Sequence, residues 1–173
     1  MKKFYFILFF ILLVANFLIY QSLSAPRILE VTILEVGEKG LPAGRQGNAI
    51  LIRTPNNKTL LIDTGPDASI LRALGAALSM WQRRIDAVVL TSEKASSVGG
   101  LPDVTSRYYI PTPIHFGTAA VPYGTRLAFD SVSVAVLYAD LLNISYGSAS
   151  FSISSTTPKG TYISDGKIMT KTK

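Results

Sequence analysis

The sequence predicts a mixed α/β fold whose second half consists mainly of β-strands. Between residues 49 and 90, two short apolar runs are followed by apolar residues at helical spacing and then by a third apolar run. After residue 108, short β-prone segments separated by glycines replace this order. The chain has 173 residues, 48% of them hydrophobic, which is enough for one such core.

The first strands are expected at residues 28–36, 49–54 and 59–63, where β-branched and apolar residues dominate. The last two are joined by Pro55-Asn56-Asn57-Lys58, and asparagine tolerates the positive φ of a tight hairpin turn. The polar segment 38–45, rich in glycine and proline, is expected to be a surface loop.

A helix is expected after Thr64-Gly65-Pro66-Asp67, because apolar residues recur at helical spacing between residues 70 and 78. Residues 85–90 form the next expected strand, so the strand–helix–strand order predicts a crossover unit packed on a sheet. The later strands are expected at residues 126–129, 132–138, 141–146, 151–155 and 161–164.

The N-terminal segment is expected to meet a membrane. Residues 4–20 are almost entirely apolar, near the lower limit for a helix that crosses a bilayer. Lys2 and Lys3 precede this run, so the positive-inside rule keeps them in the cytoplasm and sends the body outside. The alternative is a cleaved signal peptide, since Ser22, Ser24 and Ala25 are small enough for a cleavage region.

Residues 1–25 are therefore expected to be a membrane anchor or signal segment, and residues 28–173 the folded domain. The chain has no cysteine, which excludes disulfides, thiolate metal sites and cysteine nucleophiles. The net charge of +6 is spread thinly and indicates only weak attraction to nucleic acid or anionic lipid. Four arginines near aromatic residues either form a basic face or are solvated helix ends, and the second reading is preferred: Arg72, Arg83, Arg84 and Arg107.

Two motifs resemble the metallo-β-lactamase-like domain of ComEC-type competence proteins. The strand–turn–strand segment QGNAILIRTPNNKTLLIDTG resembles the family's QGDAILI…PNGKTLLIDGG. The later segment IDAVVLTSEKASSVGGLPDV resembles the family's IDALVLTHPHADHIGGLPDV. The resemblance implies a reduced metallo-β-lactamase-like αββα sandwich. The apolar segment at the N-terminus separately predicts a transmembrane helix before this domain.

The same alignment implies that the metal site is lost. The family's His, His, Asp and His ligands fall on Ser92, Lys94, Ser96 and Ser97, and its later bridging aspartate falls near Ser154 or Ser155. Serine hydroxyls are weak neutral donors, whereas zinc requires imidazole, thiolate or carboxylate ligands. The one histidine, His115, lacks partner ligands in the sequence. Four residues are expected to shape the structural loop instead: Asp63, Gly65, Gly99 and Gly100.

The expectation is therefore a domain that is not an enzyme and has no metal or other cofactor. It would be tethered to the cytoplasmic membrane through residues 4–20, with the body outside the cytoplasm. Its role would be structural or binding, with a protein partner still unidentified and a link to DNA uptake that only the resemblance implies. Nucleic acid as a partner is weakly supported. The alternative is a divergent ComEC-like metallo-hydrolase that acts on nucleic acid.

Overall fold

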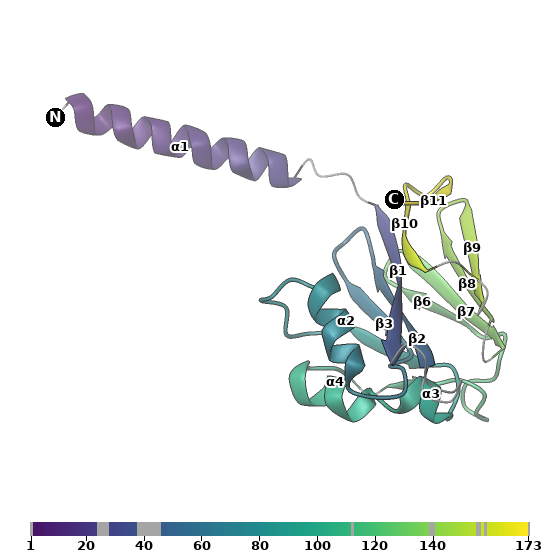
Figure 1. Ribbon diagram of the computed structural model, residues 1–173. Helices are drawn as coiled ribbons and strands as arrows, with labels where there is room; N and C mark the ends of the chain where they lie inside the picture. Colours follow the sequence, from purple (N-terminus) through teal and green to yellow (C-terminus); the bar gives the residue numbers. More distant parts are fainter. Residues whose placement is uncertain are drawn as a thin grey trace.

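The computed structural model describes residues 2–23, 28–37, 46–111, 113–138, 141–154, 157 and 159–172. The helix α1 (Lys2–Leu23) comes first, and two β-sheets with three short helices follow it (Figure 1). The mixed α/β class predicted from the sequence is confirmed. The segment 38–45, expected to be a surface loop, lies outside the described residues.

The larger sheet has seven strands in the order β11-β10-β1-β2-β3-β4-β5. The pairs β3–β4 and β4–β5 are parallel, and the other neighbours are antiparallel. Apolar residues with few interruptions form its central strands, as expected for strands covered on both faces. The strands are β1 (Leu29–Gly37), β2 (Gln46–Arg53), β3 (Thr59–Ile62), β4 (Ala87–Leu90), β5 (Ile114–His115), β10 (Gly160–Ser164) and β11 (Met169–Lys171).

The predicted hairpin between β2 and β3 is confirmed, and Asn57 adopts the expected positive φ of 61° at its turn. The predicted crossover is also confirmed, because α2 (Ser69–Ala77) connects the parallel strands β3 and β4. Two further helices, α3 (Ala95–Val98) and α4 (Leu101–Arg107), follow β4 where only a polar loop was expected.

The smaller sheet contains β6 (Arg126–Phe129), β7 (Val132–Tyr138), β8 (Leu141–Tyr146) and β9 (Ala149–Ser154) in sequence order. All its neighbours are antiparallel, and the first three strands match the predicted ranges. Its inner face packs on the larger sheet through a shared core that includes Ile52, Ile62, Val134 and Ile144. A second core, with Leu61, Ile70, Leu74 and Val104, fills the space between the larger sheet and helices α2 and α4.

The expected αββα sandwich therefore needs a correction. In the described part of the chain, helices cover the larger sheet alone, so the layers are helix, sheet and sheet (Figure 1). The outer face of the smaller sheet is polar: Asn143 Nδ2 donates to Ser150 Oγ at 3.0 Å and to Ser152 Oγ at 3.2 Å. A face of serine and asparagine side chains is hydrated by solvent and needs no apolar helix to cover it.

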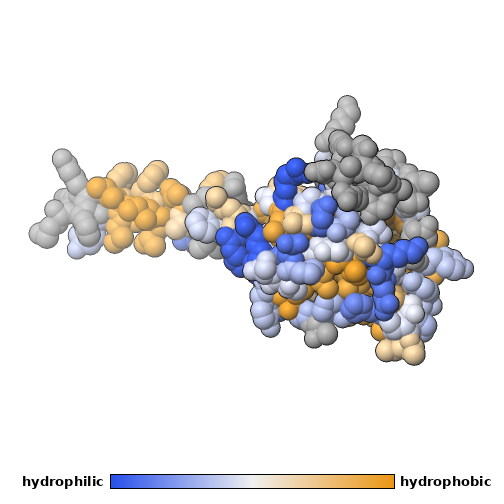
Figure 2. All heavy atoms as spheres, turned by 60° about the horizontal axis from the view of Figure 1, so that its bottom comes forward, coloured by the Kyte–Doolittle hydropathy of each residue, from blue (hydrophilic) through white to orange (hydrophobic). Residues whose placement is uncertain are grey.

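Helix α1 is apolar along its described side chains except at Asn16, whose Nδ2 donates to the Leu12 carbonyl at 2.9 Å. The large apolar side chains of residues 5–14 and Phe17 are exposed, and ten consecutive positions place them on every side of the helix. Figure 2 shows hydrophobic side chains along the face of the helix that is in view. Within the residues that the structure describes, no helix has both the length and the hydropathy needed to cross a membrane, so the expected transmembrane helix is not found there.

Candidate functional site at the carboxyl ends of the parallel strands

The candidate site lies where the parallel strands β3, β4 and β5 end. Leu90 pairs with His115 in the register, and Ile62 pairs with Val89. The residues that follow these strands therefore meet at one edge of the sheet, the usual position of ligand sites in sheets of this type. The segment 91–100, including α3, folds over this edge and brings all four positions aligned with metal ligands to it.

Asp63 connects the ends of β3 and β4. Its carboxylate accepts the Thr91 backbone N–H at 2.8 Å and the Thr91 hydroxyl at 2.6 Å. Asp63 has a positive φ of 57°, an uncommon backbone conformation that these bonds help to hold. Burial raises the pKa of Asp63 to about 6, and the hydrogen bonds from Thr91 oppose this rise. Through these bonds Asp63 links the end of β3 to Thr91, the residue that follows β4.

Glycines allow segment 91–100 to lie directly on the turn after β3. The Gly100 N–H donates to the Gly65 carbonyl at 3.0 Å, and a Cβ on Gly100 would be 2.5 Å from the Thr64 carbonyl oxygen. A Cβ on Gly99 would lie directly against the Pro66 carbonyl oxygen. Because these neighbours are backbone atoms that cannot move aside, only glycine fits at both positions.

The structure brings together two of the four residues aligned with metal ligands. The Ser92 hydroxyl donates to the Ser97 hydroxyl at 3.0 Å. Ser97 is buried, and its carbonyl accepts the Thr64 N–H at 2.7 Å and the Thr64 hydroxyl at 3.0 Å. Lys94 is exposed and Ser96 is half-buried. The hydroxyls of Ser92 and Ser97 thus pair with each other at the position where the resemblance would place a metal.

These residues do not fit a zinc site. Glu93 and His115 are exposed, and the Asp63 carboxylate is already bonded to Thr91. Across the described ranges, no group of three or more histidine, aspartate or glutamate residues is placed to hold a metal ion. Zinc requires three or four such donors, and the ammonium of Lys94 would repel a cation. The chemistry of the side chains at this site therefore does not fit a zinc ion.

The position of the later bridging aspartate gives the same result. Ser154 ends β9, and its backbone N–H donates to the Thr157 hydroxyl at 2.8 Å. A serine hydroxyl cannot replace a bridging carboxylate as a metal ligand. Ser155, the other candidate for this position, lies outside the described residues.

Tyr123 belongs to this edge and was missed in the sequence. Its hydroxyl donates to the Thr91 carbonyl at 2.9 Å, so Thr91 is held by Asp63 on one side and by Tyr123 on the other. The Tyr123 ring lies over Gly117, where a Cβ would be 2.8 Å from the ring. No motif or spacing signals a contact across this separation in the chain.

The comparison with family models agrees with the fold. Residues 42–137, more than half of the chain, match the model of the metallo-beta-lactamase superfamily. The chain therefore belongs to the metallo-β-lactamase superfamily. No curated protein matches it.

Two of the solved structures to which the chain is similar come from Cronobacter sakazakii (Enterobacter sakazakii). One is a metallo-beta-lactamase with an HARLDQ motif, with 14% sequence identity, a TM-score of 0.44, and coverage of 60% of this chain and 51% of that chain. The other is a mutant of the HARLDQ-motif protein, with 15% identity, a TM-score of 0.46, and coverage of 69% and 60%. The chain thus spans between half and three-fifths of the length of these two structures.

Proposed function

We propose that this chain is a non-catalytic member of the metallo-β-lactamase superfamily, of the ComEC type, with a structural or binding role. The observation that supports the proposal is the kind of side chain at the four positions aligned with metal ligands, at the sheet edge where β3, β4 and β5 end. Ser92, Ser96 and Ser97 offer neutral hydroxyls, Lys94 offers a cation, and Ser92 is already bonded to Ser97. Without a metal to lower the pKa of a bound water, the hydrolytic chemistry typical of the superfamily has no nucleophile.

Metal content and nuclease activity test this proposal. The full chain would be purified in detergent, incubated with Zn²⁺ or Mn²⁺, desalted and examined by elemental analysis, with DNA cleavage measured in parallel. We expect neither stoichiometric metal nor cleavage. About one or more bound ions per chain, together with cleavage that a chelator abolishes, would instead establish the alternative of a divergent ComEC-like metallo-hydrolase acting on nucleic acid.

A fourfold variant provides the matched positive control for metal binding. The substitutions Ser92→His, Lys94→His, Ser96→Asp and Ser97→His restore the donor types of the resembled motif. We expect this variant to retain more metal than the natural chain, with no cleavage, because a serine also stands where the bridging aspartate would be. Circular dichroism of the variant shows whether the fold tolerates a larger side chain at the buried position of Ser97.

We also propose that the chain is attached to the inner membrane through residues 4–20, as a single-pass protein with the body outside the cytoplasm. The support is the almost entirely apolar run, the two lysines before it, and the exposure of the side chains of residues 5–14 in the structure. Membrane fractions should contain the protein after washing at high pH, and protease added outside the inner membrane should digest the body. A mature chain that begins at Ala25 would show a released protein and contradict the attachment.

The link to DNA uptake is the least direct part of the proposal, and it rests on the ComEC-type resemblance. It predicts that deletion of the gene lowers the frequency of transformation without changing growth. An unchanged transformation frequency in a naturally transformable host would contradict the link to DNA uptake. The structural or binding role of the body would then have to serve another process.

A further inference from the structure

The end of the body where the chain enters lies opposite to the candidate site. Strand β1 is antiparallel to β2, and β2 is antiparallel to β3, so β1 and β3 run in the same direction. The site lies at their carboxyl ends, which places the amino end of β1, at Leu29, at the other end of the sheet. We call this other end, with the loops that surround Leu29, the entry end.

The loop of residues 78–86, between α2 and β4, belongs to the entry end. Arg53 shows this directly, because its guanidinium donates to the Glu30 carboxylate at 2.8 Å and to the Ala77 carbonyl at 3.1 Å. Glu30 is the second residue of β1, and Ala77 is the last residue of α2. The loop that follows α2 therefore starts beside the first residues of β1.

The tip of this loop exposes large apolar side chains. Met80 is 73% exposed and Trp81 is 83% exposed, the largest exposed fraction among the exposed large apolar residues described. Arg83 and Arg84 follow and are also exposed. On the other side of β1, the turn between β10 and β11 exposes Ile168 at the same end, since Leu29 pairs with Ser164.

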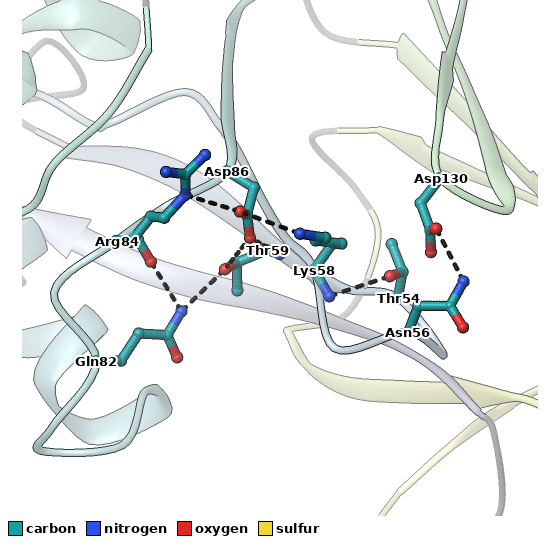
Figure 3. Close-up of polar contacts among 8 residues, drawn as sticks. All are labelled: Thr54, Asn56, Lys58, Thr59, Gln82, Arg84, Asp86 and Asp130. Atoms are coloured by element: carbon teal, nitrogen blue, oxygen red, sulfur yellow. Dashed lines mark hydrogen bonds and ion pairs between the residues drawn. The ribbon is translucent and has the colours of Figure 1, made fainter.

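A polar network holds the base of the loop in place (Figure 3). The Asp86 carboxylate accepts the Thr59 N–H at 2.9 Å and the Arg84 Nε–H at 3.0 Å. Gln82 Nε2 donates to the Thr59 hydroxyl at 2.8 Å and to the Arg84 carbonyl at 3.0 Å. Because the base is fixed to β3 in this way, the exposure of Met80 and Trp81 is a built property of the fold and not the result of a loosely held loop.

The chemistry of this tip matches a membrane surface. Tryptophan favours the interface between hydrocarbon and water, where its ring is buried and its N–H stays hydrated. A thioether such as that of Met80 gains by burial in acyl chains, and an arginine nearby pairs with phosphate groups. The loop 78–86 carries two cations, Arg83 and Arg84, and one carboxylate, Asp86, which lies 3.0 Å from Arg84 Nε and 3.9 Å from Lys58 Nζ. The local balance is positive and therefore favours anionic lipid.

The length of the chain places this tip within reach of a bilayer that holds α1. Only residues 24–27 separate α1 from the described residue Ile28. A fully extended chain of this length spans at most about 18 Å, so Ile28 cannot lie farther than that from Leu23, the last residue of α1. A membrane in which α1 is embedded therefore lies near Leu29, and the loop that carries Trp81 begins beside the first residues of β1.

We propose that the entry end of the body docks on the surface of the membrane, with Met80 and Trp81 inserted among anionic lipids and Arg83 at the headgroups. This inference rests on the proposed attachment of α1. In this arrangement the loop is a second membrane contact that fixes the orientation of the body. The edge of the sheet that holds the candidate site, with Ser92 and Lys94, then faces away from the membrane.

Trp81 is the only tryptophan in the chain, so the tryptophan fluorescence of the protein reports on the environment of this one residue. The full chain would be reconstituted into vesicles of phosphatidylglycerol and phosphatidylethanolamine, or of phosphatidylcholine alone, and attachment scored by flotation. In the anionic vesicles we expect Trp81 emission at shorter wavelength, protection from acrylamide, and quenching by lipids brominated near the headgroup. Met80→Ser and Arg83→Gln should weaken this quenching. Tyr138→Ser, which removes an exposed apolar side chain at the opposite end, should leave it unchanged.

Three other outcomes would overturn the inference, and they are distinguishable. If the chain floats with the vesicles but acrylamide still quenches Trp81 fully, the attachment stands and the docking is wrong. If the chain does not float, the attachment itself fails, and the docking fails with it. If single-stranded DNA, but not lipid, shifts the emission of Trp81, the tip is a nucleic-acid contact.

Discussion

Removal of residues 38–45 tests whether the segment between β1 and β2 is only a surface loop. In the structure Val36 pairs with Gly47, and Gly37 pairs with Gln46. The deletion joins Gly37 directly to Gln46, which become the two central residues of a hairpin closed by the pair Val36–Gly47. Gly37 already has a positive φ of 98°, the sign that a type II′ turn requires at its first central position.

Two opposing effects set the expected magnitude. The connection between Val36 and Gly47 shortens from residues 37–46 to two residues. The lower entropy cost of closing this shorter connection raises the free energy of unfolding by about 1 kcal/mol. Against this, the Gly37 N–H donates to the Ser69 hydroxyl at 2.6 Å, and a reoriented turn peptide would lose this bond at a cost of about 1 kcal/mol. The closing pair is well held, because Val36 packs directly against Gly65. The free energy of unfolding should therefore stay level or rise by at most about 1 kcal/mol.

Urea unfolding of the full chain in mild detergent, followed by circular dichroism, measures this difference in the free energy of unfolding. A control replaces residues 38–45 with glycine and serine at the same length. It removes any packing of their side chains on the body without changing the length of the loop. A loss of several kcal/mol in both variants would refute the reasoning, because it would mean that side chains of residues 38–45 pack on the body. A loss in the deletion alone would show that the two-residue turn does not form.

The remaining predictions concern the site edge. Asp63 binds a proton more tightly when folded, with a pKa near 6 against 3.8 for an unperturbed group. Between these two pH values the folded state holds more protons than the unfolded state, so the free energy of unfolding should fall as pH rises, by roughly 3 kcal/mol at most. Urea titrations at several pH values should show this fall, and Asp63→Asn should remove it; an equal slope in the variant contradicts the assignment. Gly99→Ala should cost about 1–3 kcal/mol, because its Cβ meets the Pro66 carbonyl. The matched control Gly75→Ala, at an exposed helical position with nothing near its Cβ, should stabilise by about 0.5–1 kcal/mol, and equal effects at both glycines would contradict the packing argument.

Local signals explain which elements were predictable. The β2–β3 hairpin was found because its turn depends on neighbouring residues, above all on Asn57. Helices α3 and α4 were missed, since they have only four and seven residues and lie in a segment rich in serine and glycine. Helices this short do not form on their own, and α4 is stabilised by burial of Val104 against the larger sheet. The three-residue strand β11 has no apolar alternation and was also missed.

The contacts of the candidate site could not be predicted from the sequence. The alignment with the family motif identified Ser92, Lys94, Ser96 and Ser97 as a group, and the structure brings them to one edge. The bonds that fix this edge, from Thr91 to Asp63 and from Tyr123 to Thr91, join residues about thirty positions apart. Their partners are set by the crossover of β3, β4 and β5, which no local pattern encodes.

The scaffold of this edge and the positions aligned with metal ligands are physically separable. Asp63, Gly99 and Gly100 each join two segments through hydrogen bonds or close backbone contacts, so changes there disturb the fold. Lys94 is exposed, and Ser92 and Ser96 are only half-buried, so side chains at these positions can change at little cost to stability. A fold of this superfamily can therefore keep this loop while the side chains at its exposed positions differ. If the entry end docks on a membrane as we propose, that loop is the part of the body best placed to meet a partner, and Ser92, Lys94 and Ser96 are the side chains at which binding should be sought first.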